Sequence, residues 1–298
     1  MTITQRTKAV TGNAATQLGL SDRDLVAFVE SSGGASRGAG SAALRAARYH
    51  LESGGKRARA ELSLQAGTAL GVPESDNLAL AATVELLHNS SLVFDDLQDR
   101  DTERRGAPAV WAKFGPDVAL CTGALLLSAA YGALSSLSDG SRIGPLVAHT
   151  HRRTALLIHG QTADLAVSAH SHTTLGEYEQ VAAEKSGVLF ALPIELALLY
   201  AGCEDAVPQA RRAAHALAIG YQIADDLEDL ESDVAASNGA GRLNYVLLAN
   251  ERSASGGIEL ARERALELLD ESIALAEALP HGAGVPLQAL ARRFAARI

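Results

Sequence analysis

Helical spacing of apolar and small residues runs through nearly every long segment of the chain and restricts its fold more than any other feature. From Ile258 such residues recur every three or four positions until Pro280, and the same spacing covers Leu78 to Val93. A period of about 3.6 residues is typical of an amphipathic helix. Alternating stretches rich in β-branched residues are scarce, so strands have little support. We therefore expect an all-α protein.

The breaks between the helical segments are short and rich in glycine, proline and polar residues, so none of them is a convincing domain linker. They lie at residues 31–40, 71–75, 106–108, 114–116, 203–208, 237–241 and 253–257. No internal repeat is evident. We expect one domain over residues 1–298, a single large helical bundle whose many alanines allow close packing, with residues 1–20 flexible.

Charge and composition exclude several classes of protein. The 298 residues include 35 acidic and 26 basic side chains, a net charge of −9, and 47% of them are hydrophobic. This balance is typical of a globular protein and argues against a nucleic-acid binder, which needs clustered Lys and Arg to neutralise phosphates. The first residues lack the apolar core of a secretory signal, so we expect a cytoplasmic protein.

Val118 to Ser138 contains no charged residue and is long enough to cross a bilayer. Seven of its residues are Ser, Thr or Gly, and no basic cluster flanks it. We therefore expect no transmembrane segment, but a helix buried on all sides within the bundle. Cys121 and Cys203 lie far apart in apolar surroundings, so we expect two buried thiols and neither a disulfide nor a metal site.

Two acidic motifs, DDLQD and DDLED, each follow an apolar helical segment. Their aspartates are Asp95, Asp96, Asp99, Asp225, Asp226 and Asp229. In each motif the first and last aspartates are four residues apart and share one helix face, where like charges repel and require a cation. Mg²⁺ is suited, because it takes one or two carboxylates and completes its shell with water and phosphates. One such motif would more often be a solvated helix face, but two copies without Lys or Arg favour metal binding.

Basic residues stand near the acidic motifs. GGKRAR places Lys56, Arg57 and Arg59 after two glycines, and Arg104 and Arg105 follow the first acidic motif. Arg binds phosphate bidentately, and Lys binds it as a point charge. Each residue alone would be an ordinary surface charge. Together with two carboxylate faces they indicate a diphosphate held between metal ions and guanidinium groups.

The order of these motifs resembles the trans-isoprenyl diphosphate synthase (polyprenyl synthetase) family, most closely its short-chain geranylgeranyl and farnesyl diphosphate synthases. The matching segments are GGKRAR (54–59), ELLHNSSLVFDDLQDRDTERRGAPAVW (85–111), GQTADL (160–165), EKSGVLF (184–190) and IGYQIADDLED (219–229). The resemblance implies helices bundled around a deep central cavity, usually in a homodimer. It also implies a Mg²⁺-dependent prenyltransferase, with three ions per site, that condenses isopentenyl diphosphate with dimethylallyl, geranyl or farnesyl diphosphate.

The same resemblance implies roles for individual residues. The magnesium ligands would be Asp95, Asp96, Asp99, Asp225, Asp226 and Asp229. The allylic diphosphate would be bound by Arg104, Lys185, Ser186 and Gln222. Isopentenyl diphosphate would be bound by Lys56, Arg59, His88 and Arg105. The cavity near the reacting carbons would be lined by Gln161 and Asp164.

Product length in this family depends on side-chain size four and five positions before the first acidic motif, where bulky residues stop the chain at farnesyl. These positions hold Ser91 and Ser90, which are small. We therefore expect a cavity that stays open past them and geranylgeranyl diphosphate as the preferred product. Leu125, Leu126 or Tyr131 on the following helix is expected to form its floor.

Some residues depart from the family pattern. Phe94 replaces a frequent His, Tyr221 replaces the usual Phe, and Ala124 replaces a common Asp. The loop after Asp229 is short and offers only Arg242 in place of the usual lysines. These differences bear on how the site closes over the allylic substrate.

Two other functions stay open. A class I terpene cyclase has Asp-rich metal sites, but it has no second diphosphate for Lys56, Arg59 and Arg105 to bind. A non-catalytic partner subunit of a prenyl synthase would be expected to lose one or both acidic motifs, and both are intact. His170 and His172 share a loop, but no carboxylate or Cys accompanies them at ligand spacing, which argues against a metal site there.

Overall fold

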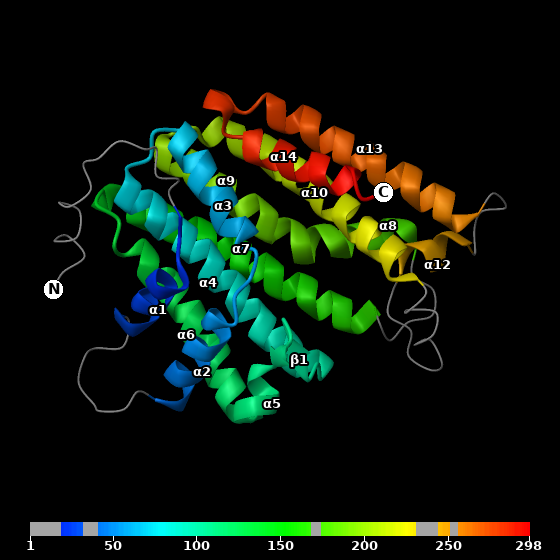
Figure 1. The fold of residues 1–298 in the computed structure, drawn as a ribbon. Coiled ribbons are helices and arrows are strands. Elements are labelled where there is room, and N and C mark those ends of the chain that lie inside the picture. Colours follow the sequence, from blue (N-terminus) through cyan, green and yellow to red (C-terminus); the bar gives the residue numbers. More distant parts are fainter. Residues whose placement is uncertain (1–18, 32–40, 168–173, 231–243, 251–255) are drawn as a thin grey trace.

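The computed structural model describes residues 19–31, 41–167, 174–230, 244–250 and 256–298, with the backbone alone for 163–167. Within these ranges the chain is almost entirely helical, which confirms the all-α expectation (Figure 1). The first α-helices are α1 (Asp22–Ser31), α2 (Ala42–Glu52), α3 (Ala58–Ala69), α4 (Glu74–Asp99), α5 (Val110–Phe114), α6 (Pro116–Leu134) and α7 (Gly140–Val167). They are followed by α8 (Leu175–Ala182), α9 (Val188–Ala201), α10 (Val207–Glu228), α12 (Tyr245–Asn250), α13 (Gly257–Glu277) and α14 (Val285–Ala295).

Shorter elements connect these helices. They are the two-residue strands β1 (Glu103–Arg104) and β2 (Ala107–Pro108), the π-helix η2 (Ala183–Gly187), and the 3₁₀-helices η3 (Glu204–Ala206) and η4 (Pro280–Gly282). The predicted breaks at 71–75, 114–116 and 203–208 fall at helix ends. Most of the residues expected to be flexible lie outside the described ranges, as do His170 and His172 in one segment and Arg242 in another.

Helix starts follow the local sequence. Ser41 caps α2 by accepting a hydrogen bond from the Leu44 amide, and Thr174 forms a reciprocal capping box with Glu177 at the start of α8. α6 begins at Pro116, whose missing N–H costs nothing in the first turn. These caps satisfy backbone groups that a helix end leaves without partners.

The helices form two packed groups that meet at α3, α4 and α9. α4 packs on α3, α6 and α9, while α10 packs on α9, α13 and α14. Figure 1 shows α4 through the middle, α13 and α14 along the upper edge, and α2 and α5 at the lower edge. Every residue of α4 from Ala79 to Leu87 and of α9 from Val188 to Leu198 is buried. These stretches are therefore enclosed, and their polar residues face neighbouring helices or internal space, as the ion pair of Glu195 with Arg153 of α7 shows.

The uncharged segment forms α6, but the expectation that it is buried on all sides is wrong. Leu120 is 51% exposed, Cys121 and Ala124 are also exposed, and only 44% of the most apolar window of α6 is buried. Among the described helices it alone is long and apolar enough to cross a bilayer, while it packs along α4 and α2. Cys203 is partly buried, so the expectation of two buried thiols is also wrong.

Candidate active site

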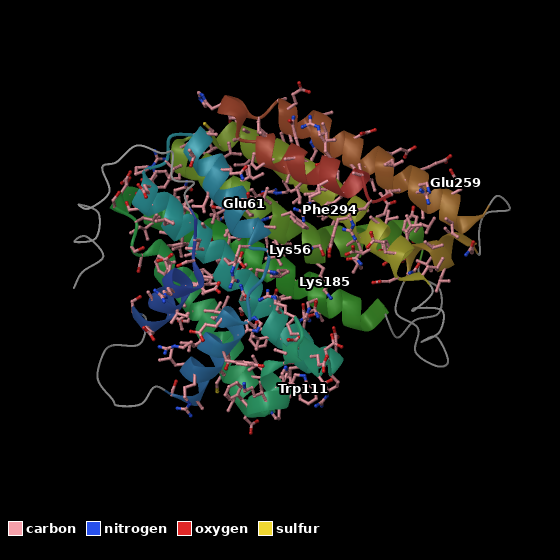
Figure 2. All side chains as sticks on the ribbon, in the orientation of Figure 1. Lys56, Glu61, Trp111, Lys185, Glu259 and Phe294 are labelled. Atoms are coloured by element: carbon pink, nitrogen blue, oxygen red, sulfur yellow. The ribbon has the colours of Figure 1, made fainter. Side chains whose placement is uncertain are left out.

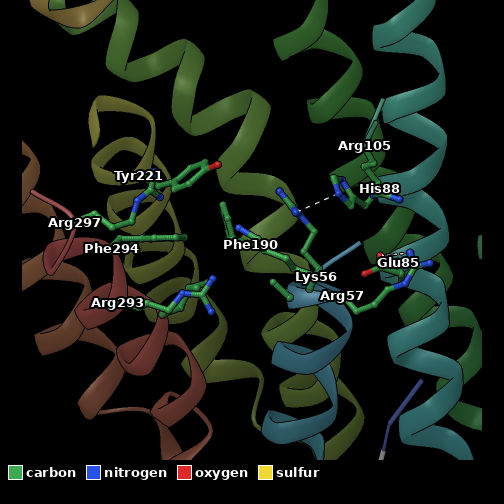
Figure 3. A pocket seen from close by; sticks show the side chains of 13 residues that line it. Lys56, Arg57, Glu85, His88, Arg105, Phe190, Tyr221, Arg293, Phe294 and Arg297 are labelled. Carbon is green, nitrogen blue, oxygen red and sulfur yellow. Dashed lines mark hydrogen bonds and ion pairs between the residues drawn. The ribbon is translucent and has the colours of Figure 1, made fainter. Parts of the chain in front are cut away.

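Two adjoining cavities lie between the helix groups, and Arg59 and His88 line both of them. We call the first the basic cavity; its volume is about 380 Å³, and its charged and aromatic lining is Lys56, Arg57, Arg59, Glu85, His88, Arg105, Phe190, Tyr221, Arg293, Phe294 and Arg297 (Figure 3). We call the second the apolar cavity; its volume is also about 380 Å³, and its lining includes Ser90, Ser91, Phe94, Asp95, Leu127, Thr154, Gln161, Lys185 and Ser186. One space is therefore suited to an anion and its neighbour to a hydrocarbon chain.

The turn before α3 and a hairpin after α4 bring cations to the basic cavity. Gly54 and Gly55 have φ angles of 84° and 144°, and a Cβ on Gly55 would lie 2.9 Å from the Arg105 guanidinium carbon. Arg105 occupies the hairpin turn with Gly106, both at positive φ, and donates a hydrogen bond to the Gly54 carbonyl. Other residues rarely adopt these positive φ angles, so the GG pair allows the turn that brings the Gly54 carbonyl to Arg105.

Arg59 and His88 contact each other where both cavities share their lining. Arg59 Nη1 lies 3.2 Å from His88 Nε2, and the guanidinium stacks 4.7 Å from the centre of the Phe190 ring. Burial, followed by the charge of Arg59, lowers the pKa of His88 well below its usual value, and burial also lowers the pKa of Arg59. Arg59 Nε and His88 Nδ1 are buried without a hydrogen-bond partner. An anion here would satisfy both the charge and the free donors.

Arg57, the remaining cation of GGKRAR, is engaged with carboxylates. Its Nη1 lies 2.9 Å from Glu85, and its Nη2 lies 2.5 Å from Asp22. It therefore ties α1, α3 and α4 together at the wall of the basic cavity.

The first acidic motif lies at the end of α4, and its aspartates differ in their surroundings. Asp95 lines the apolar cavity, and Asp99 is exposed one turn later. Asp96 is fully buried and accepts a hydrogen bond from Arg104 Nε at 2.8 Å, while its Oδ2 has no hydrogen-bond partner. Burial, with the charge of Asp99 opposed by that of Lys185, raises the pKa of Asp95 to about 6.

The second acidic motif ends α10 with a different set of partners. Asp225 Oδ1 lies 2.8 Å from Arg297 Nη2. Asp226 is buried and accepts hydrogen bonds from the Tyr178 hydroxyl and the Tyr245 amide, each at 2.7 Å. Asp229 is exposed just beyond the helix. Asp225 thus contacts Arg297, which lines the basic cavity, whereas Asp226 is buried and bound by Tyr178 and Tyr245.

The π-helix η2 carries Lys185 and Ser186 to the apolar cavity. A Cβ on Gly160 would lie 2.9 Å from the Glu184 backbone carbon, so glycine lets α7 approach η2 closely. Figure 2 shows Lys56 and Lys185 toward the middle of the bundle, while Glu259 and Trp111 lie at its periphery.

Two further candidate residues are placed apart from the cavities. Gln222 lines neither cavity and donates a hydrogen bond to Asp226 Oδ1 at 3.4 Å. The side chain of Asp164 lies outside the described residues, whereas Gln161 lines the apolar cavity and donates to Gln98 Oε1 at 3.0 Å.

Two small side chains of α4 and residues of α6 and α7 form part of the wall of the apolar cavity. Ser90 donates to the Gly123 carbonyl at 2.9 Å and Ser91 to the His88 carbonyl at 2.8 Å, so both hydroxyls are satisfied where they line the cavity. Leu127 and Thr154 also line it, and the Tyr131 hydroxyl lies 3.2 Å from Thr154 Oγ1. Tyr131 therefore supports this wall from behind.

The sequence reasoning did not include Arg293 and Arg297, although both line the basic cavity. Arg293 lies in the last turn of the amphipathic helix α14, and Arg297 follows four residues later in the turn after the helix; this spacing of four was the available signal. Nothing in the sequence indicated that Arg297 would meet α10.

The carboxylates suit a metal that is bound together with a phosphate ligand. Within the described residues no group of three His, Cys, Asp or Glu side chains could hold an ion unaided. Mg²⁺ needs only one or two carboxylates when substrate phosphates complete its shell. Asp95 is partly buried without a hydrogen bond or ion pair to any described residue, and its raised pKa shows that a neighbouring cation would stabilise it. The residues therefore fit a metal–diphosphate complex.

Comparison with known proteins agrees with this geometry. The family model "Polyprenyl synthetase" matches residues 41–241. A geranylgeranyl diphosphate synthase from Methanosarcina mazei is 32% identical over 62% of this chain and 58% of that protein, and a (2E,6E)-farnesyl diphosphate synthase from Mycobacterium bovis is 36% identical over 58% and 48%. The chain thus spans about half the length of these two curated relatives.

The fold is also found among solved structures. A geranylgeranyl pyrophosphate synthetase from the archaeon Geoglobus acetivorans superimposes with a TM-score of 0.79, covering 92% of this chain and 95% of that one at 24% identity. At this identity the likeness establishes the helical fold.

Proposed function

Because the chain belongs to the polyprenyl synthetase family, we propose that it is a trans-prenyltransferase that joins isopentenyl diphosphate to an allylic diphosphate and releases pyrophosphate. The observation that carries this proposal is the pair of adjoining cavities sharing Arg59 and His88. A reaction between two diphosphates, one with a growing hydrocarbon chain, needs a second anion site beside an apolar one. The basic and apolar cavities provide this arrangement.

Isopentenyl diphosphate is assigned to the basic cavity. Lys56, Arg59 and Arg105 surround its diphosphate, and neutral His88 offers a further polar contact. The free donors of Arg59 and His88 support this assignment, because buried donors without partners favour an anion at that point.

The allylic diphosphate is assigned to the mouth of the apolar cavity between the two acidic motifs. Mg²⁺, in three ions by analogy with the family, would be held by Asp95, Asp99 and Asp225, and when bound it stabilises charge on the departing diphosphate. Lys185 and Ser186 line the cavity beside Asp95 and would contact the same group. Asp96, Asp226, Asp229, Arg104 and Gln222 complete the set implied by the family resemblance.

The chain itself needs to supply no strong nucleophile. The allylic carbon–oxygen bond ionises, the double bond of isopentenyl diphosphate attacks the resulting cation, and a proton leaves to the departed diphosphate. The apolar wall excludes water, which would otherwise quench the cation as an alcohol. The side chains around the cavity therefore act by binding, orientation and exclusion of water.

The preferred product is geranylgeranyl diphosphate. Ser90 and Ser91 both line the apolar cavity and are small, which supports a chain longer than farnesyl. Curated relatives include both geranylgeranyl and farnesyl diphosphate synthases, so product length is decided by assay.

A homodimer and a cytoplasmic location belong to the same proposal. α6 and α7 expose the apolar side chains of Leu120 and Leu156 by 51% and 43%, which a second copy of the chain would cover. Sedimentation of the purified protein should give twice the 30.9 kDa mass of the chain. A monomer at micromolar concentration would contradict the dimer.

The decisive experiment incubates the purified protein with Mg²⁺, labelled isopentenyl diphosphate and each allylic primer in turn. We expect label in a longer prenyl diphosphate. Cyclised hydrocarbon without incorporation of label would instead indicate a terpene cyclase, and no turnover of any primer would indicate a non-catalytic partner subunit.

A further inference from the structure

Arg297 lies where the second acidic motif meets the basic cavity. Its Nη2 is 2.8 Å from Asp225 Oδ1 and 2.6 Å from Glu228 Oε2, and its Nε donates to Glu228 Oε1 at 2.9 Å. The same side chain lines the basic cavity beside Arg293, as Figure 3 shows. One guanidinium thus contacts a carboxylate assigned to metal and borders the space assigned to the second diphosphate.

Two aromatic rings support this guanidinium from the cavity side. Its central carbon lies 5.9 Å from the centre of the Tyr221 ring and 5.8 Å from that of Phe294, and the two rings are 4.6 Å apart. The Arg297 side chain is 32% exposed. A planar cation on an aromatic surface can pivot while it keeps its stacking. The contact with Asp225 is a one-point ion pair and partly exposed, so it shifts an equilibrium by only about fivefold or less and can be exchanged. The two-point contact with Glu228 must also give way when Arg297 turns, and Glu228 itself is half exposed.

A metal ion and Arg297 would compete for the carboxylate of Asp225. A divalent cation that binds Asp225 must displace or weaken the contact between Arg297 Nη2 and Asp225 Oδ1, because both positive charges need the same carboxylate. A displaced Arg297 borders a cavity that already holds Lys56, Arg59, Arg105 and Arg293. These five cations repel one another unless an anion is present, whereas Arg57, the sixth cation of the lining, is paired with Asp22 and Glu85. The cavity therefore favours a diphosphate once Arg297 has turned toward it.

We propose that Arg297 is shared between the two halves of the site: it neutralises Asp225 while that carboxylate has no metal, and it turns to isopentenyl diphosphate when metal-bound allylic diphosphate displaces it. This inference rests on the proposed function and assigns to Arg297 a part in both binding steps. Removing its charge should therefore affect the two ligands in opposite directions.

The test compares Arg297→Gln with two variants of α14. Arg293→Gln removes a cation that lines the basic cavity without contacting Asp225, and Arg292→Gln removes an exposed cation that lines neither cavity. Affinity for Mn²⁺ in the presence of inorganic pyrophosphate is measured by electron paramagnetic resonance of free Mn²⁺. The KM for isopentenyl diphosphate is measured at saturating metal and allylic primer.

For Arg297→Gln we expect Mn²⁺ to bind about three- to fivefold more tightly and the KM for isopentenyl diphosphate to rise about tenfold. Arg293→Gln should raise this KM with no change in Mn²⁺ affinity, and Arg292→Gln should change neither. Arg297→Lys keeps the charge without the planar fork, and it should restore Mn²⁺ affinity toward the parent value while the KM stays raised.

Unchanged or weaker Mn²⁺ binding by Arg297→Gln would overturn the inference, as would a profile identical to that of Arg293→Gln. A parent protein that incorporates no isopentenyl diphosphate would contradict the proposed function instead. In that case the Mn²⁺ titration would still decide whether Arg297 competes for Asp225.

Discussion

The two acidic motifs have the same spacing at the ends of α4 and α10, and their middle aspartates behave alike while their first aspartates differ. Asp96 and Asp226 are both buried and accept hydrogen bonds, the first from Arg104 and the second from Tyr178 and Tyr245. Each holds the segment that follows its helix. The middle aspartate is therefore a structural acceptor in the metal-free protein.

The first aspartates differ in what balances their charge. Asp95 lines the apolar cavity without an ion pair to any described residue, whereas Asp225 is paired with Arg297. Burial raises the pKa of Asp95 to about 6. One motif thus presents a carboxylate that has no ion pair with a described residue and is only partly balanced by the charges of Lys185 and Arg104, and the other presents one that is paired with Arg297. Equal sequence spacing does not give equal electrostatics, because the partners come from other helices.

The largest expected effect is on catalysis. Asp95→Asn and Asp225→Asn each remove a carboxylate assigned to the metal–diphosphate complex. We expect kcat/KM to fall by about a hundredfold to a thousandfold in either variant. Steady-state incorporation of labelled isopentenyl diphosphate measures this. Asp117→Asn, an exposed carboxylate at the start of α6, is the control and should keep parent activity. Full activity of either variant would show that its motif is not used.

The next largest effect is on stability, and it should differ between the middle and the last aspartate of the second motif. Asp226→Ala leaves the Tyr178 hydroxyl and the Tyr245 amide without an acceptor, so we expect the free energy of unfolding to fall by about 2–4 kcal/mol. Asp229→Ala changes an exposed residue, whose interactions are weakened by solvent, and should cost about 1 kcal/mol or less. Urea unfolding of the metal-free proteins measures both. Equal stabilities would contradict the structural role of Asp226.

Replacing the first aspartate of each motif by asparagine should change the stability of the metal-free protein in opposite directions. The folded-state pKa of Asp95 is raised, so its ionisation costs stability as pH rises through about 6. Asp95→Asn should therefore be more stable than the parent by roughly 1–3 kcal/mol at pH 7.5, and this gain should vanish below pH 4.

Asp225→Asn removes a carboxylate that is paired with Arg297, so it should cost up to about 1 kcal/mol at pH 7.5. Thermal melts of both variants across this pH range provide the comparison. A gain in stability for Asp225→Asn, or no gain for Asp95→Asn, would contradict the view that Asp225 is ion-paired and Asp95 is not.

The smallest effect concerns the residues one turn before each motif. Ser91 lies four positions before Asp95 and lines the apolar cavity, whereas Tyr221 lies four positions before Asp225 and lines the basic one. Ser91→Phe should shorten the product and Ser91→Ala should not. Tyr221→Phe should leave product length unchanged, because its ring stays in place and only the hydroxyl near Asp225 is lost. Chromatography of the dephosphorylated products measures this, and an unchanged distribution for Ser91→Phe would contradict the assigned path of the chain.

Much of the fold followed from the sequence because helical periodicity and turn residues act locally. The helix containing Leu78–Val93, the break at 71–75 and the shared face of Asp95 and Asp99 all depend on spacing along one segment. The glycine pair before Lys56 could likewise be recognised as a close approach, although its partner Arg105 became evident only in the structure.

The remaining features depend on contacts between distant segments. The exposed side of α6 depends on which helices cover it, and its composition alone suggested full burial. The ion pair of Asp225 with Arg297 joins residues 72 positions apart. The burial of Asp96 and Asp226 depends on hydrogen bonds that the motif itself does not encode. Residue type and spacing therefore predicted the chemistry that we propose, while tertiary packing decided which partners each carboxylate has.

The central claim is that one metal–diphosphate complex bridges the two acidic motifs. Crystals soaked with Mn²⁺ and inorganic pyrophosphate, with data collected at the manganese absorption edge, test it most directly. We predict anomalous peaks beside Asp95 and Asp225 with pyrophosphate between them, and Arg297 turned away from Asp225. Manganese at one motif alone, or at neither, would contradict the account.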